Sequence, residues 1–164
     1  MRIAGIIKNS VVNGIGIRDV LFLQGCTHHC EGCHNPGTWD LNGGQELSVP
    51  EVMRNFAGSK RMTISGGEPL LQFEHILDFM RFMNFEYGTR FWLYTGFNYE
   101  DIPYWKLQML AKYVDVLVDG KFEIDKKDLT LRFRGSSNQR LIDLPKTVGR
   151  MKVVLWEEEN EEFR

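Results

Sequence analysis

The sequence lacks any apolar run long enough to cross a membrane and any excess of positive charge. A membrane-spanning helix needs about 20 consecutive apolar residues, whereas the opening stretch is interrupted by Lys8, Asn9 and Asn13 and does not have the form of a secretory signal. The formal net charge of -2, with no long basic stripe among the 20 lysines and arginines, argues against binding to nucleic acid. We also find no internal repeat and no low-complexity linker. We therefore expect a cytoplasmic protein, with no membrane or nucleic-acid partner, whose residues 1–164 form a single domain.

The sequence also lacks a fourth cysteine. Its three cysteines, Cys26, Cys30 and Cys33, lie close together in the stretch GCTHHCEGCHN, at the spacing C-x3-C-x2-C. Thiolates this close cannot usefully cross-link a fold, but one loop can present all three to a single metal centre. A cuboidal iron–sulfur cluster ordinarily takes four thiolates, so three would leave one iron open to a molecule from solution. A reducing compartment suits thiols that must stay free for a metal.

Two other interpretations of this loop remain open. His28, His29 and His34 lie beside the cysteines, so the loop also carries the ligands of a zinc site with three cysteines and one histidine. Alternatively, the cysteines are unpaired buried thiols, although free cysteines gain nothing by clustering.

Apolar patterning predicts strands that alternate with helices. The predicted strands lie at 20–23, 61–64, 91–94 and 114–118, and helical spacing of apolar residues predicts helices over 48–56, 73–83 and 107–114. Weaker signals suggest a strand at 129–133 and a strand or helix at 151–156, and the acidic run over 157–162 is expected to be a solvated end. Alternation of this kind gives βαβ units. The predicted fold is therefore α/β, an open partial (βα) barrel of about five or six mainly parallel strands.

An unusual turn follows each of the four clearest predicted strands. These turns are the cysteine loop and residues 66–68, 95–96 and 119–120. Because the carboxyl ends of parallel strands meet at one edge, all four turns should share the C-terminal rim where such folds place their ligands. In SGGEP the glycine pair allows close backbone approach to a ligand, and the carboxylate of Glu68 could accept from an amine. Taken alone, SGGEP would be better explained as a tight turn closed by Pro69, and the cysteine loop on the same rim favours the ligand site.

These stretches carry a resemblance. The loop GCTHHCEGCHN followed by SGGEP resembles the radical S-adenosylmethionine enzymes, whose C-x3-C-x2-C loop holds a 4Fe-4S cluster. More narrowly, the chain resembles the family of anaerobic ribonucleoside-triphosphate reductase-activating proteins, which activate a glycyl-radical enzyme. Six stretches carry this resemblance in order: VVNGIGIRDVLFLQGC, CHNPGTWD, SGGEPL, WLYTGF, DVLVDGKF and RGSSNQR. It spans residues 7–143, and residues 145–164 lie outside it.

The resemblance implies site residues. Cys26, Cys30 and Cys33 would bind three irons, and the amino and carboxylate groups of S-adenosylmethionine would bind the fourth. The implied cofactor contacts are Gly32, Cys33, His34, Gly66, Gly67 and Glu68, with Arg18, Thr95, Asp119 and Lys121 as further candidates. Ordinary turns explain the stretches around Arg18 and Asp119 equally well.

The sequence departs from the superfamily at one position. In many radical S-adenosylmethionine enzymes an aromatic residue precedes the last cysteine and touches the adenine, whereas here Gly32 stands in that place. A ring contact to adenine must then come from His34 or from elsewhere in the chain.

The activity implied is reductive cleavage of S-adenosylmethionine to methionine and a 5′-deoxyadenosyl radical, which removes a hydrogen from a glycine of the partner. No catalytic residue beyond the cluster and cofactor is implied. The implied partners are the large subunit of the anaerobic ribonucleotide reductase and a flavodoxin-like reductant. The alternatives are an activase of another glycyl-radical enzyme, such as pyruvate formate-lyase, and a non-enzymatic metal-binding or electron-transfer module. Since a closed barrel needs about 250 residues, the site should be open and covered by the partner.

Overall fold

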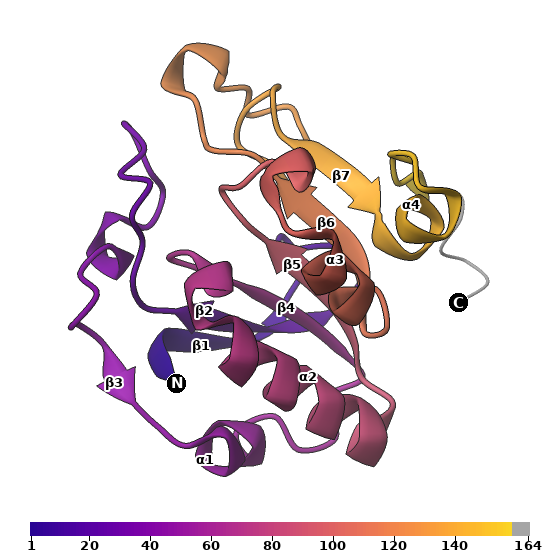
Figure 1. Cartoon of the computed structure of the whole chain (residues 1–164). Coiled ribbons are helices and arrows are strands. Elements are labelled where there is room, and N and C mark those ends of the chain that lie inside the picture. The colour runs from indigo at the N-terminus through magenta and orange to yellow at the C-terminus, as the bar shows by residue number, and fades with distance from the viewer. Residues whose placement is uncertain (159–164) are drawn as a thin grey trace.

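The computed structural model describes residues 1–158, which form one mixed β-sheet with helices packed against it (Figure 1). Residues 159–164, with the acidic side chains Glu159, Glu161 and Glu162, lie outside the described residues. The strands, in the order β3-β1-β2-β4-β5-β6-β7 across the sheet, are β1 (Arg2–Ser10), β2 (Arg18–Leu23), β3 (Gln45–Glu46), β4 (Arg61–Gly66), β5 (Arg90–Tyr94), β6 (Val114–Asp119) and β7 (Arg140–Asp143). The α-helices of the described chain are α1 (Val49–Arg54), α2 (Phe73–Tyr87), α3 (Tyr104–Leu110) and α4 (Leu144–Arg150). Short 3-10 helices are η1 (Pro36–Thr38), η2 (Pro69–Gln72), η3 (Tyr99–Asp101) and η4 (Ile124–Lys126).

The middle of the sheet is parallel. Strand β2 pairs with β4, β4 with β5, and β5 with β6, all in the parallel direction. The crossovers between them contain α1, α2 and α3 in turn, so the predicted alternation of strand and helix is confirmed over this part of the chain. The carboxyl ends of these strands therefore lie at the same edge of the sheet.

The outer strands run antiparallel to their neighbours. Strand β1 is antiparallel to β2 and β3, and β7 is antiparallel to β6. The partial barrel of about five or six mainly parallel strands is thus not confirmed, and the described chain instead forms an open mixed sheet of seven strands with β3 and β7 at its edges. Strand β1 was absent from the prediction because Lys8 and Asn9 interrupt its apolar pattern. Both side chains are exposed, and Lys8 bonds Asp19 on β2 at 2.6 Å.

The two weaker assignments near the C-terminus were wrong. Residues 129–133 form an irregular loop rather than a strand, and Phe133 has a φ of 62°, which extended backbone excludes. Residues 151–156 form neither a helix nor a named strand. The elements in this region are instead β7 and α4, which begins at the cap residue Asp143 with Pro145 in its first turn.

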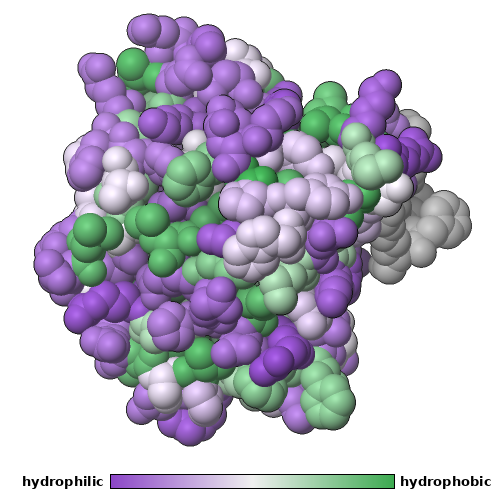
Figure 2. Space-filling view, viewed as in Figure 1, coloured by the Kyte–Doolittle hydropathy of each residue, from purple (hydrophilic) through white to green (hydrophobic). Residues whose placement is uncertain are grey.

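The main core lies between the sheet and the helices. The predicted helix over 73–83 is confirmed as part of α2, and its buried apolar side chains form much of this core: Phe73, Ile76, Phe79, Met80 and Met83. Strand residues such as Ile64, Phe91 and Leu93 meet them from the sheet. On the outer side of this layer, Figure 2 shows hydrophilic side chains surrounding small apolar patches.

The opposite face of the sheet is covered differently. Successive strand residues point to opposite faces, so Trp92 points away from the helices. It forms a second hydrophobic cluster with Val116, Val118 and Leu141. Loop residues cover this cluster, with the Phe133 ring 5.3 Å and the Trp156 ring 5.1 Å from the Trp92 ring. Nearer the carboxyl ends of the parallel strands, the same face opens into a pocket.

Within residues 1–158, no helix has both the length and the apolar character needed to cross a membrane.

Candidate functional site

A pocket of about 590 Å³ lies at the carboxyl ends of the parallel strands. Each of the four predicted turns contributes to its wall: Cys26, Cys30 and Cys33 after β2, Gly66 and Gly67 at the end of β4, Thr95 and Gly96 after β5, and Gly120 and Lys121 after β6. Its volume lies within the range of about 300–1,000 Å³ that is usual for small-molecule sites. The predicted convergence of the turns at one rim is therefore confirmed.

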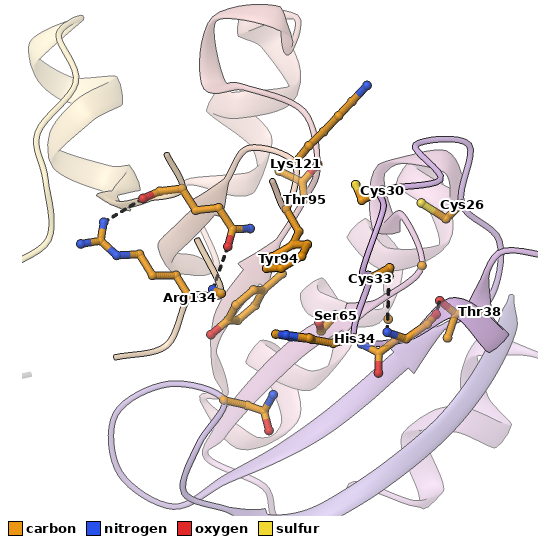
Figure 3. Close-up of a pocket in the computed structure, with 18 of the residues that line it drawn as sticks. Cys26, Cys30, Cys33, His34, Thr38, Ser65, Tyr94, Thr95, Lys121 and Arg134 are labelled. Carbon is orange, nitrogen blue, oxygen red and sulfur yellow. Dashed lines mark hydrogen bonds between the residues drawn. The ribbon is translucent and has the colours of Figure 1, made fainter. Parts of the chain in front are cut away.

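All three cysteines belong to this wall. Cys26 is buried, and Cys30 and Cys33 are half-buried. In Figure 3 they lie together on one side of the pocket, with Tyr94 and Arg134 across from them. The loop itself donates to the sulfurs: the N–H of His28 lies 3.5 Å from Cys26 Sγ, and the N–H of Asn35 lies 3.3 Å from Cys33 Sγ. Such bonds favour the thiolate, which is the form that binds a metal.

Burial raises the pKa of both Cys26 and Cys30. At Cys30 a hydrogen bond from the backbone N–H of Phe122 and the positive charge of Lys121 oppose this rise, and at Cys26 the N–H groups of His28 and His29 do so. Cys26 and Cys30 are thus neutral thiols that give up their protons when a metal binds, and the nearby amide groups are placed to stabilise the resulting thiolates.

This donor set fits an iron–sulfur cluster with one open iron, since the sequence has no fourth cysteine. Of the nearby histidines, His28 bonds Glu68 through Nε2, which disfavours it as a zinc ligand. The His29 ring lies edge-on to Trp39 at 5.0 Å, and the His34 ring lies 5.1 Å from that of Phe122. Within residues 1–158, no three or more histidine, cysteine, aspartate or glutamate side chains are arranged around a single-ion site.

The glycine pair lets the turn after β4 pack directly on the backbone of the cysteine loop. A Cβ on Gly67 would overlap the carbonyl oxygen of Gly25, and a Cβ on Gly66 would overlap the backbone of Leu23. Backbone bonds close the same contact, because the Gly67 N–H donates to the Leu23 carbonyl at 2.8 Å and the Glu68 N–H donates to the Gly25 carbonyl at 2.7 Å. Both glycines therefore hold the loop in place as well as lining the pocket.

Glu68 lies behind the pocket wall rather than on it. The residue is 0% exposed, and its carboxylate is surrounded by donors. Oε1 accepts from the Leu70 N–H at 2.9 Å and from the Thr95 hydroxyl at 2.8 Å, while Oε2 accepts from His28 Nε2 at 2.9 Å and from the Gly96 N–H at 2.8 Å. We expected this carboxylate to face an amine of the cofactor. The structure instead places it between the cysteine loop and the turn after β5.

Arg18 does not line the pocket. It begins β2, at the opposite end of that strand from the cysteine loop, and is 3% exposed. Its guanidinium donates to Thr63 Oγ1 at 3.0 Å and to the Met62 carbonyl at 2.8 Å. These contacts join β2 to β4 away from the site.

The remaining candidates divide between the wall and the core. Thr95 and Lys121 line the pocket, whereas Asp119 is 1% exposed and is not part of the lining. Its carboxylate accepts from the Tyr99 N–H at 2.7 Å and from Arg140 Nε at 3.0 Å. Asp119 thus joins β6 to β7 and to the η3 turn.

Phe122, which is not among the predicted site residues, occupies the space beside Gly32. Gly32 has a φ of +70°, and a Cβ there would lie 2.8 Å from Ile124 Cδ1 and 3.3 Å from Phe122 Cε1. The Phe122 ring lies at 43° to that of His34, and both line the pocket. Phe122 ends the stretch DVLVDGKF, which carries part of the family resemblance, but only the fold shows that the segment after β6 lies against the cysteine loop.

Tyr94 and residues 131–135 form another part of the wall. The Tyr94 hydroxyl donates to the Phe133 carbonyl at 2.8 Å, and burial raises the pKa of Tyr94 well above its usual range. Arg134 donates to the Gln139 carbonyl at 2.7 Å. The bond from the neutral Tyr94 hydroxyl joins the 131–135 segment to β5, and the bond from Arg134 joins it to the residue before β7.

Comparisons with known proteins place this site in a family context. A family model described as a 4Fe-4S single cluster domain matches residues 12–142. The chain is 41% identical over 138 residues to the anaerobic ribonucleoside-triphosphate reductase-activating protein of Enterobacteria phage T4, which covers 79% of this chain and 86% of that protein. It is 37% identical over 139 residues to the protein of the same name from Escherichia coli (strain K12), covering 79% and 90%. For the Haemophilus influenzae protein of that name the figures are 34% over 139 residues, covering 79% and 89%.

Proposed function

Because the chain belongs to the family of anaerobic ribonucleoside-triphosphate reductase-activating proteins, we propose that it reductively cleaves S-adenosylmethionine at a 4Fe-4S cluster and generates a glycyl radical on the large subunit of that reductase. One observation carries the proposal: three cysteines, with no fourth in the sequence, face a pocket that has room for a small molecule beside them. When bound, the cluster supplies an electron and S-adenosylmethionine supplies the radical. The chain contributes binding, orientation and the exclusion of water.

Cys26, Cys30 and Cys33 are the proposed ligands of three irons. The thiolates that form on binding are stabilised by the N–H groups that already point to their sulfurs, from His28 to Cys26 and from Asn35 to Cys33. The sequence offers no further cysteine for the remaining iron, which would be open to a small molecule bound in the pocket that the other turns line.

The proposed contacts of S-adenosylmethionine come from the pocket wall. Backbone groups at Gly66 and Gly67 suit its amino group, which needs acceptors. The rings of His34 and Phe122 suit its adenine, since aromatic pairs gain from offset or tilted packing. Lys121 adds a positive charge near the carboxylate end, and Gly32 contributes by leaving room for Phe122.

The proposed substrate is a glycine-bearing segment of the reductase, with a flavodoxin-like protein as the electron donor. The pocket wall includes Val11 and Val12, which are 65% and 72% exposed, and therefore its rim is open to an incoming chain. A segment inserted there would cover the site while it presents the hydrogen to be removed.

The test uses anaerobically reconstituted protein mixed with reductant, S-adenosylmethionine and the reductase large subunit. We expect iron and sulfide in the amounts of one 4Fe-4S cluster, release of 5′-deoxyadenosine, and a glycyl radical detected by electron paramagnetic resonance. Cys26→Ala, Cys30→Ala and Cys33→Ala should each abolish the product, because two thiolates cannot hold a cluster with an open iron.

Parallel reactions separate the alternatives. In one parallel reaction pyruvate formate-lyase replaces the reductase. A glycyl radical formed only in that reaction would show that the partner is pyruvate formate-lyase. Zinc without iron in the purified protein would indicate a metal-binding module. Native rates from any one cysteine variant would show that the ligand assignment is wrong.

A further inference from the structure

A buried hydrogen-bond network joins Glu68 to the cysteine loop through His28. The side chains of these two residues are 0% and 8% exposed, with Glu68 Oε2 and His28 Nε2 2.9 Å apart. The same carboxylate accepts from Thr95 and Gly96. The Thr95 hydroxyl itself accepts the Phe97 N–H at 3.2 Å, which leaves its hydrogen for Glu68. One carboxylate thus connects the turns that follow β2, β4 and β5.

The imidazole of His28 is held on several sides. Glu68 fixes its Nε2, and the Phe97 ring packs edge-on at 4.7 Å and 72°. Gly96 is required on another side, because a Cβ there would overlap His28 Cδ2. These contacts fix the position of the His28 ring. A fixed ring restricts the backbone of the same residue.

The restricted backbone of His28 contacts Cys26, one of the three proposed cluster ligands. The His28 N–H lies 3.5 Å from Cys26 Sγ, and the N–H of His29 also bonds to that sulfur. His29 has a φ of 48°, so the loop makes a sharp local turn around Cys26. Hydrogen bonds to cluster sulfurs are among the features that set the reduction potential of iron–sulfur clusters.

We propose that Glu68 and His28 are positioning residues that set the reduction potential of the cluster by holding the N–H groups of His28 and His29 on the sulfur of Cys26. The inference rests on the proposed cluster at the three cysteines. Glu68 acts on the cluster through His28, rather than on S-adenosylmethionine. Because a hydrogen bond to sulfur favours the more negative, reduced state, loosening this network shifts the potential to more negative values.

The test compares His28→Gln with His28→Leu. The amide nitrogen of glutamine reaches about as far as imidazole Nε2 and keeps a donor for Glu68, whereas leucine has none. Each reconstituted protein is first analysed for iron and sulfide, with no partner or substrate present. Its cluster is then titrated electrochemically while the electron paramagnetic resonance signal of the reduced cluster is followed. We expect His28→Leu to shift the potential to more negative values and alter the signal, and His28→Gln to stay near wild type.

The matched control is His75→Leu. It makes the same change at an exposed histidine of α2 that does not line the cysteine pocket. The potential should be unchanged. Gly96→Ala serves as a second variant, because it displaces the His28 ring while keeping every hydrogen-bonding group, and it should shift the potential in the same direction as His28→Leu.

The outcomes separate this inference from the proposed function. The expected shift in a His28→Leu protein that keeps its iron and sulfide supports the inference, whereas loss of the cluster in that variant overturns it, because the network would then hold the loop together rather than set the potential. Equal potentials and signals in wild type, His28→Leu and Gly96→Ala overturn the inference. An equal shift of the potential in His28→Leu and His28→Gln also overturns it. Neither result contradicts the proposed function. A wild-type protein that binds no cluster at the cysteines overturns the proposed function instead.

Discussion

Among single residues, Gly67 shows how a glycine beside a candidate ligand site can serve packing first. Its missing Cβ makes room for the carbonyl of Gly25, the residue before the first cysteine. We expect Gly67→Ala to lower the free energy of unfolding by about 1–3 kcal/mol, as overpacking commonly does, and to reduce iron retention because the cysteine loop must move. Urea unfolding and iron analysis of reconstituted protein measure the two effects.

Gly37→Ala provides the control for Gly67→Ala. Gly37 also lies near the cysteine loop, but a Cβ there would meet nothing within 4 Å. Its unfolding midpoint and iron content should match those of the wild type. If Gly67→Ala also matches, the contact with Gly25 is not a constraint on the site.

Between elements, Arg140 at the start of β7 links β6 to the η3 turn. Its guanidinium bonds Asp119 at the end of β6 and Glu100 in η3, the latter at 2.7 Å and 3.0 Å. The hydrogen bond from Arg140 lowers the pKa of Glu100 below its ordinary value of 4.5. Glu100 thus contributes stability above that value, and the contribution is lost as the pH falls through the lowered pKa.

We therefore expect Glu100→Gln to be less stable than wild type by about 0.5 kcal/mol at neutral pH, since the pair is largely exposed. The difference should stay constant down to the ordinary pKa of 4.5 and shrink below it. Urea unfolding from neutral to acid pH measures it. Glu86→Gln, at an exposed position of α2, should show no such pH-dependent difference. A difference that grows as the pH falls would contradict the assignment.

In the molecule as a whole, residues beyond the matched family region return to the sheet. The Trp156 N–H donates to the Leu141 carbonyl at 2.8 Å, and the Asp143 N–H donates to the Val154 carbonyl at 2.9 Å. The Trp156 ring then packs on Trp92 and, at 6.4 Å, on Phe133, which lines the pocket. The segment around Trp156 thus supports the face of the sheet from which the site opens.

Trp156→Ala should accordingly lower the free energy of unfolding by about 2 kcal/mol, less than the loss for a fully buried tryptophan because this one is half-buried. Urea unfolding followed by circular dichroism measures the change. Trp105→Ala removes a tryptophan that is 51% exposed on α3 and should cost less. Equal losses in the two variants would mean that the C-terminal segment adds nothing specific.

The features that the sequence alone determined are those whose causes lie within a few residues. The spacing of Cys26, Cys30 and Cys33 places three thiols in one loop wherever that loop lies. The Ser48 N–H bonds the Glu51 carboxylate at 2.8 Å, as the capping pair predicts, and the apolar spacing of α2 fixes its buried side. Parallel strands with their turns at one rim followed from the alternation of such local signals.

The tertiary structure decided what depends on segments that are distant in the chain. Strands β1 and β7 pair antiparallel at positions that no apolar pattern marks, because the exposed Lys8 and Asn9 interrupt β1 and because β7 has only four residues. Glu68 meets His28 across 40 residues, and Phe122 reaches Gly32 only after three crossovers have brought β6 beside the cysteine loop. Which side chain faces the pocket and which one supports it from behind depends on such contacts, and they form only when the sheet assembles.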